Sequence, residues 1–294
     1  MNDDDLLYHY TSASGLIGIL GNTHSAPALW LTQIQYMNDD AEFYHAYELA
    51  QKEIVRLSGE CPGVRKVISG MYGLPYEKDG GTPYPIGRDW GTRIFVFSLT
   101  EKPDLLSQWR GYAPEGGYCI GFKVADLKRL AAAHALDLFQ CMYRDEEKSS
   151  NISSMLREIE ANLRSGYVDP EIPELSRLEE AERAEATARL HVQMILGEIA
   201  PMFKHSSFEE EREWRIVGVV GANDTRARWR ARGNAIIPYC ELDISASGPS
   251  PLPAAEVIVG PGVDFALANQ AIRFMNYNSF GQVPIKLSAS TLRR

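Results

Sequence analysis

The sequence of 294 residues has no long apolar run, no signal-peptide pattern and no excess of positive charge. A membrane-spanning helix needs about 20 apolar residues in a row, and no segment approaches that length. The acidic start Met1-Asn2-Asp3-Asp4-Asp5 lacks the basic and apolar regions of a signal peptide. These absences predict a cytoplasmic protein that has no membrane as a partner.

Metal-binding and nucleotide-binding signatures are also missing. The four cysteines, Cys61, Cys119, Cys141 and Cys240, show no C-x-x-C spacing, and no two histidines have the spacing H-x-x-x-H or H-E-x-x-H. We therefore expect free thiols and no metal cofactor. The G-x-G-x-x-G and Walker patterns are absent, so a dinucleotide would not be held by a standard Rossmann or P-loop device.

Positive charge is scarce overall but has one local concentration. The chain carries 30 Lys and Arg residues against 39 Asp and Glu residues, a net charge of −9, which disfavours a uniformly basic surface for nucleic acid. The alternating residues Arg226, Arg228, Arg230 and Arg232 would share one face of an extended strand and suit phosphates. Nucleic-acid binding is therefore an alternative that we do not favour over a charged hairpin.

The order of short apolar stretches and helical stretches indicates the fold class. We expect an α+β fold, in which helices flank a mixed, mostly antiparallel sheet. Residues 1–294 are expected to form a single domain with a helical insertion around residues 146–201. The expected strands are 6–10, 28–32, 93–99, 117–124, 138–143, 213–220, 235–242, 256–260 and 283–287, and the main expected helices are 14–20, 38–57, 64–72, 104–112, 125–135, 173–199 and 264–277.

Two candidate site segments lie near the start of the chain. On its strand, His9 points away from Tyr8 and Tyr10, toward a cavity or solvent. The alternative is a core histidine bonded to the backbone. The second segment carries Asn38, Asp39, Glu42 and Tyr44, where Asn and Asp are helix caps by default and the aromatic side chains could stack on a planar ligand.

Two further candidate segments lie later in the chain. Gln108, Trp109, Arg110 and Tyr112 fall within five positions, which suits a ligand with a ring and a phosphate, or else a Trp–Tyr corner of the core. Glu211, Glu213 and Arg215 are expected on one face of a strand, with Trp214 and Ile216 turned to the core. Carboxylates beside a guanidinium on a buried face need mutual pairing or a function, whereas an exposed ion-paired face needs neither.

Taken in order, these segments resemble domain-of-unknown-function family 2971 over nearly the whole chain. The first segment also has a distant similarity to ADP-ribosyltransferases of the His-Tyr-Glu type. That resemblance implies an ADP-ribosyltransferase-like fold, NAD as a substrate, and transfer of ADP-ribose to a macromolecular acceptor or hydrolysis of NAD. Such activities occur in bacterial toxins and phage-defence proteins.

This interpretation, combined with the chemistry of the candidate segments, assigns roles to individual residues. His9 would hold the ribose, Tyr44 or Trp109 would stack on nicotinamide, and Arg110 would bind the pyrophosphate. The expected catalytic residues are Glu213, Glu211 and His9, and the expected NAD-binding residues are His9, Tyr10, Thr11, Asn38, Asp39, Glu42, Tyr44, Gln108, Trp109, Arg110, Tyr112 and Arg215.

These residues should line one cleft of about 300–1,000 Å³ if they form a small-ligand site. The alternative in another functional class is a sensor that binds a nucleotide without catalysis. The choice between Glu211 and Glu213 as the catalytic carboxylate stays open at this point, although Arg215 should pair with Glu213 more easily than with Glu211.

Overall fold

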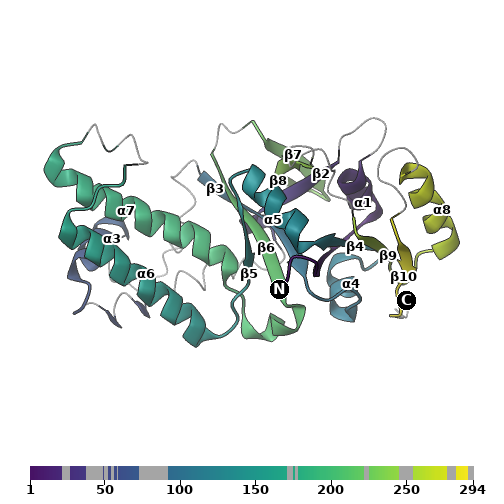
Figure 1. The fold of residues 1–294 in the computed structure, drawn as a ribbon, viewed down its shortest axis with the longest axis horizontal. Coiled ribbons are helices and arrows are strands. Elements are labelled where there is room, and N and C mark those ends of the chain that lie inside the picture. Colours follow the sequence, from purple (N-terminus) through teal and green to yellow (C-terminus); the bar gives the residue numbers. More distant parts are fainter. Residues whose placement is uncertain are drawn as a thin grey trace. The chain divides into compact units, whose positions relative to one another are not determined.

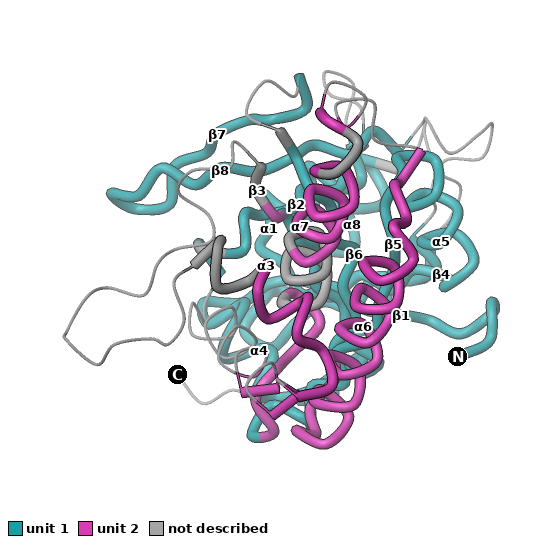
Figure 2. The backbone as a smooth tube through the Cα atoms, turned by 90° about the vertical axis from the view of Figure 1, so that its left-hand side faces the viewer, with its two compact units in different colours: residues 1–37, 95–141, 207–294 teal, residues 38–94, 142–206 magenta. Residues whose placement is uncertain are grey.

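The structure is a computed structural model, and its chain contacts define two compact units (Figures 1 and 2). Unit 1 comprises Met1–Met37, Phe95–Cys141 and Ser207–Arg294, and unit 2 comprises Asn38–Ile94 and Met142–Ser206. The expected helical insertion at 146–201 lies within unit 2, which also includes a segment nearer the N-terminus. The structure describes residues 1–21, 27–37, 49, 52–53, 56–57, 59–72, 92–170, 175, 178–221, 225–244, 254–276 and 283–290.

Unit 1 contains the sheet (Figure 1). Its strands are β1 (Leu6–Thr11), β2 (Ala28–Gln33), β3 (Thr92–Thr100, which begins at the end of the unit 2 segment), β4 (Tyr118–Lys123), β5 (Asp137–Gln140), β6 (Glu213–Gly221), β7 (Ala227–Arg232), β8 (Ala235–Asp243), β9 (Glu256–Val259) and β10 (Ile285–Leu287). Its helices are α1 (Ala13–Leu20), α4 (Leu106–Tyr112), α5 (Val124–Ala133) and α8 (Phe265–Asn276), with short 3-10 turns η1 (Ile34–Tyr36) and η4 (Ser206–Glu211).

The strands form one branched sheet. Its main order is β10-β9-β4-β1-β3-β2-β8-β7, and β6 joins at β3 and carries β5. β9 and β10 are parallel, whereas the pairs β1–β4, β2–β3, β2–β8, β4–β9, β5–β6 and β7–β8 are antiparallel. The predicted α+β class with a mixed, mostly antiparallel sheet is confirmed.

The two faces of the sheet bury different side chains because successive residues of a strand point to opposite sides. Leu7 of β1 belongs to the larger core, which also contains apolar residues of α1, α5 and α8. Tyr8 and Tyr10 belong to a smaller cluster with Trp109 of α4 and Cys119 of β4. Helices therefore flank both faces, and α4 lies on the face that Tyr8 and Tyr10 share.

The turn from β1 into α1 follows from local sequence. Ser12 is the N-cap, and its Oγ accepts a hydrogen bond from the backbone N–H of Gly15 at 3.2 Å. A Cβ at position 15 would lie 1.9 Å from Oγ1 of Thr11, so a larger residue there would force the Thr11 side chain to move. This cap fixes the direction in which the chain leaves the strand that carries His9.

Unit 2 is helical. Its helices are α3 (Pro62–Tyr72), α6 (Asp145–Ser165) and α7 (Glu180–Ile199), followed by the 3-10 turn η3 (Ala200–Met202). α6 ends at Gly166, whose φ of 68° gives the left-handed C-cap that glycine favours. The buried Glu160 of α6 accepts a hydrogen bond from the backbone N–H of Val64, which satisfies one orphan donor at the start of α3.

Several expectations need adjustment. The helix expected over 173–199 begins at Glu180, the strand expected over 138–143 spans Asp137–Gln140, and most of the helix expected over 38–57 lies outside the described residues. None of the four cysteines forms a disulfide bond, as predicted, and all four are buried. Within the described ranges, no helix combines the length and the apolar character needed to cross a membrane.

Candidate functional site

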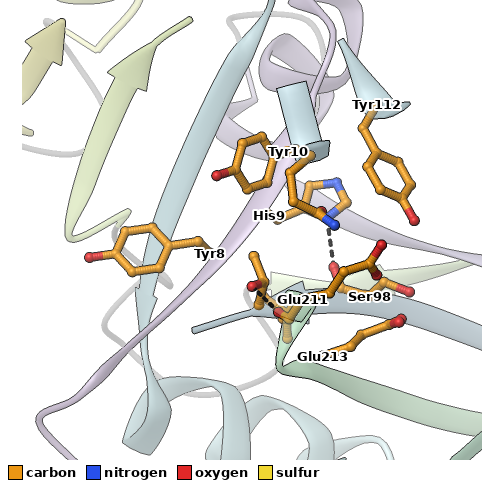
Figure 3. Close-up of a pocket in the computed structure, with 10 residues that line it drawn as sticks. Tyr8, His9, Tyr10, Ser98, Tyr112, Glu211 and Glu213 are labelled. Carbon is orange, nitrogen blue, oxygen red and sulfur yellow. Dashed lines mark hydrogen bonds between the residues drawn. The ribbon is translucent and has the colours of Figure 1, made fainter. Parts of the chain in front are cut away.

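Residues of β1, β3, α4 and the segment that enters β6 line one pocket in unit 1 (Figure 3). β1 and the end of β3 form one wall, α4 contributes a second, and the segment that enters β6 contributes two carboxylates. The pocket is lined by Tyr8, His9, Tyr10, Ser98, Leu99, Thr100, Gln108, Tyr112, Glu211 and Glu213. The expected convergence is therefore found for His9, Tyr10, Gln108, Tyr112, Glu211 and Glu213.

His9 lies where the pairing of β1 changes. β1 pairs with β4 along its whole length, but it pairs with β3 at one position, where Tyr8 lies opposite Thr100. Beyond that pair, the imidazole of His9 reaches β3, where Nδ1 lies 2.9 Å from the carbonyl oxygen of Ser98. The ring also stacks on Phe97 with a centroid separation of 4.2 Å, so two contacts fix its orientation.

The environment keeps His9 neutral. Burial lowers the pKa of His9 to about 4; the hydrogen bond to Ser98 opposes this shift, and the positive charge of Arg230 reinforces it. A carbonyl oxygen only accepts hydrogen bonds, so Nδ1 carries the proton and donates it. Nε2 of His9 is then an acceptor at neutral pH, which suits a ligand hydroxyl.

Glu213 and Arg215 form a buried ion pair. Nε of Arg215 donates to Oε1 of Glu213 at 2.7 Å, and Nη2 donates to Oε2 at 3.2 Å. Both side chains are almost fully enclosed. The predicted pairing is confirmed, and it favours the ionised carboxylate at the edge of the pocket.

The expectation that Glu211, Glu213 and Arg215 share one face of a strand is wrong for Glu211. β6 begins at Glu213, and Glu211 lies instead at the end of η4. Between them, Arg212 adopts a φ of 42°, which breaks the alternation of an extended strand. Glu211 still reaches the pocket, and its backbone carbonyl accepts a hydrogen bond from Oγ1 of Thr100. Trp214 and Ile216 contact the larger core, as predicted.

α4 separates its four candidate residues. Gln108 and Tyr112 line the pocket, whereas Arg110 is exposed and outside the lining, which does not support its expected contact with pyrophosphate. Trp109 is fully buried beside Tyr10, and its Nε1 donates to Oδ1 of Asp104 at 2.6 Å. The expected stacking of Trp109 on nicotinamide is therefore wrong for this structure, because no face of the indole is available.

Asp104 holds α4 in place. Burial alone would raise the pKa of Asp104. Hydrogen bonds from Ser288, Trp109 and the backbone of Ala289 outweigh this effect and lower the pKa. The Ser288 and Ala289 bonds measure 2.6 Å and 2.7 Å. One carboxylate thus joins the helix that carries Gln108 and Tyr112 to the chain that follows β10.

Residues outside the prediction also line the pocket. Ser98 is the most informative, because its Oγ is buried and has no hydrogen-bond partner. A buried hydroxyl without a partner is costly and commonly marks a place for water or a ligand. The alternation of β3 could have found it, since the polar residues Ser98 and Thr100 alternate with the apolar residues Phe97 and Leu99.

The remaining expected residues are not in the lining. Thr11 packs over the start of α1, and Arg215 reaches the pocket only through Glu213. Asn38, Asp39, Glu42 and Tyr44 lie outside the described residues.

The pocket is smaller than expected. Its volume is about 30 Å³, whereas small-ligand sites usually span roughly 300–1,000 Å³. It has room for a water molecule or one end of a ligand, and not for a dinucleotide. The expectation of a large cleft formed by these residues is therefore wrong.

Unit 2 has a separate polar groove of about 620 Å³, lined by Glu53, Arg56, Glu146, Ser149, Ser150, Ser153, Ser154 and Arg157. Glu53 is buried there and accepts hydrogen bonds from Arg56 and Ser153. Throughout the part of the chain that the structure describes, no cluster of three or more His, Cys, Asp or Glu residues could hold a metal ion.

Comparison with known proteins gives a family match for part of the chain. Residues 108–216 match the family model described as Protein of unknown function (DUF2971). This range contains α4 from Gln108 onward and the pair Glu213–Arg215 but not His9, so the predicted family resemblance is confirmed over a shorter stretch than expected. No curated protein and no solved structure matches the chain.

Proposed function

We propose that unit 1 binds NAD through its nicotinamide ribose and cleaves the bond between nicotinamide and that ribose, as ADP-ribosyltransferases do. The observation that carries this proposal is one pocket lined by a neutral histidine and two carboxylates. Acceptors of this kind suit the hydroxyls of a sugar, and the buried Oγ of Ser98 would gain a partner from the same ligand.

The chemistry requires a negative charge near the sugar. When the C1′–N bond breaks, its electron pair leaves with nicotinamide, and C1′ acquires the character of an oxocarbenium ion. Glu213 suits the stabilisation of that charge, because it lines the pocket and two hydrogen bonds from Arg215 hold its carboxylate in place. Water or a macromolecular hydroxyl, amine or carboxylate then forms the new bond to C1′, and a hydroxyl or amine loses its proton to a base.

Glu211 is the candidate for that base. It lines the same pocket but lies on η4 and not on the strand of Glu213. It can therefore serve the acceptor while Glu213 serves the ribose. The volume of about 30 Å³ suits only the reacting end of NAD at these residues. The rest of the dinucleotide must lie against other parts of the chain.

Release of nicotinamide from NAD by the purified full-length protein tests the proposal. Glu213→Gln should abolish release, whereas Glu211→Gln should spare part of the hydrolysis and lose transfer. Glu210→Gln is the matched control, because this exposed glutamate lies on η4 outside the pocket lining.

The outcomes are distinct. NAD binding without release would indicate the sensor alternative, and release that is equal in wild-type protein and Glu213→Gln would refute the proposed chemistry. An active but unstable Glu213→Gln variant together with an inactive Glu211→Gln variant would reverse the two roles.

A further inference from the structure

A second group of residues in unit 1 is built around Arg230 of β7. Arg230 is partly buried, and its guanidinium lies 5.7 Å from the ring centroid of Trp30 and 5.8 Å from that of Tyr239. The two rings contact each other at a centroid separation of 4.8 Å. Cation–π contacts thus hold the side chain from two neighbouring strands.

The register of the strands explains this arrangement. Arg228 pairs with Tyr239 and Arg230 with Ile237 across β7 and β8, while Thr32 of β2 pairs with Tyr239. These residues, together with Trp30, therefore share one face of the sheet. Arg228, Arg230 and Arg232 lie on one face of β7, as the sequence predicted for an extended segment, whereas Arg226 precedes the strand. The three are not equivalent.

The neighbouring arginines have backbone or carboxylate partners. Nε of Arg228 lies 3.8 Å from a carboxylate oxygen of Glu241, and Arg232 donates to the carbonyl oxygen of Tyr36 at 3.1 Å. Arg230 instead donates to the neutral Oγ1 of Thr32 at 2.8 Å. Among the described residues, no carboxylate lies within ion-pair distance of Arg230.

A desolvated guanidinium without a carboxylate is energetically unfavourable. Burial, and then the charge of Arg232, lower the pKa of Arg230, which shows that neighbouring groups do not compensate its charge. Nearby Nε1 of Trp30 is buried and has no hydrogen-bond partner. Protein groups therefore leave this cluster incompletely satisfied.

We propose that Arg230, between Trp30 and Tyr239, is an anion subsite that binds a phosphate of the nucleotide whose ribose meets His9. A guanidinium binds phosphate oxygens through two parallel N–H bonds, and the flanking rings fix its plane. The identity of the nucleotide as NAD rests on the proposed function, but the phosphate subsite itself does not. Arg230 takes the role that the sequence suggested for Arg110.

Arg230 is also close to the pocket. Thr32, to which Arg230 donates, pairs with Val96 of β3, two positions before Ser98 in the pocket lining. In addition, the charge of Arg230 is among the causes that lower the pKa of His9. The pocket at His9 is too small for a whole dinucleotide. A phosphate subsite nearby supplies a place for the part of the ligand that the pocket does not hold.

Isothermal titration of the full-length protein with ADP and with adenosine tests the subsite. Wild-type protein should bind ADP at least tenfold more tightly than adenosine. Arg230→Gln should lose that tenfold preference and keep its affinity for adenosine. Arg228→Gln is the matched control on the same strand face, and its affinity for ADP should stay within twofold of wild type.

Two additions keep the test decisive. Arg230→Lys retains the charge and removes the planar fork, so it should lose most of the ADP preference even if Arg230→Gln fails to fold. A short single-stranded DNA tests nucleic acid as the source of phosphate. Equal loss of DNA binding in Arg228→Gln and Arg230→Gln would overturn the proposal in favour of a general basic row.

The two proposals can fail separately. ADP binding that depends on Arg230, without nicotinamide release from NAD, would retain the subsite and refute the cleavage chemistry. Nicotinamide release with an unchanged KM for NAD in Arg230→Gln and Arg230→Lys would refute the subsite and retain the chemistry.

Discussion

At the scale of single residues, the site depends on charges that protein groups either compensate or suppress. Two hydrogen bonds from Arg215 compensate the negative charge of Glu213. His9 stays neutral at pH 7 because its pKa is about 4. Both residues line the same pocket. Each has a measurable consequence for stability.

Removal of Arg215 should be costly. Arg215→Met leaves the carboxylate of Glu213 buried without its main partner, and breaking such a pair typically costs about 3–5 kcal/mol. Urea denaturation should show this loss, and the double variant Glu213→Leu with Arg215→Met should recover much of it. A loss below about 1 kcal/mol in Arg215→Met would contradict the burial of the pair.

The titration of His9 predicts a pH dependence of stability. The folded pKa of about 4 lies below the unfolded value of 6.5, so the unfolded state binds more protons between these values. Stability should therefore fall as the pH decreases from about 6.5 to 4, by an amount on the order of 3 kcal/mol for His9, and the contribution should level off below that range.

Urea denaturation of wild-type protein and His9→Gln across this pH range checks the prediction. The difference in unfolding free energy between the two proteins should shift against wild type as the pH decreases. A difference that stays constant from pH 7 to pH 4 would show that His9 titrates normally.

At the scale of elements, the position of α4 is set by close packing. A Cβ on Gly260 would lie 2.5 Å from the indole of Trp109 and 2.8 Å from the carbonyl oxygen of Gly117. The chain after β9 thus approaches both the helix and the start of β4 so closely that only glycine fits. This contact, with the bonds to Asp104, determines where Gln108 and Tyr112 meet the pocket.

Gly260→Ala should therefore destabilise the fold by about 1–3 kcal/mol through overpacking. Gly111→Ala is the control within α4, because nothing lies within 4 Å of a Cβ there. This control should be neutral or gain up to about 1 kcal/mol of helix stability. Equal melting temperatures for Gly260→Ala and wild type would contradict the packing described for Trp109.

The elements also show what the sequence can predict. Short apolar stretches predicted β1, β2, β3, β6 and β8. The placement of Glu211 could not be predicted, because Arg212 adopts a positive φ without being Gly or Asn. The contacts of Arg230 depend on Trp30 and Tyr239 of other strands, which only the sheet order brings together.

Trp109 illustrates a different limit of prediction from sequence. Its sequence neighbourhood fits a stacking residue and a core residue equally well, since both roles use a large aromatic ring. The decision comes from Asp104 and Gly260, which enclose the ring from different parts of the chain. Local pattern predicted the element correctly and left the role of the side chain open.

At the scale of the whole molecule, both proposed ligand contacts belong to unit 1. The segments that build them are separated in the sequence by the two segments of unit 2. The pocket at His9 and the cluster at Arg230 use different strands of one sheet, and each has a buried polar atom without a partner, on Ser98 and on Trp30. Together they support the proposal of a ligand with both a sugar and a phosphate.

The most direct test of this account is nitrogen-15 NMR of the His9 imidazole during titration with ADP-ribose. His9→Gln identifies the signal by its disappearance. At pH 7 we expect a neutral ring protonated on Nδ1, with the Nε2 resonance shifting in a saturable manner as a ribose hydroxyl donates to it. A charged ring at pH 7, or an Nε2 resonance that stays unchanged at saturating ADP-ribose, would contradict the assignment of this pocket to a ribose.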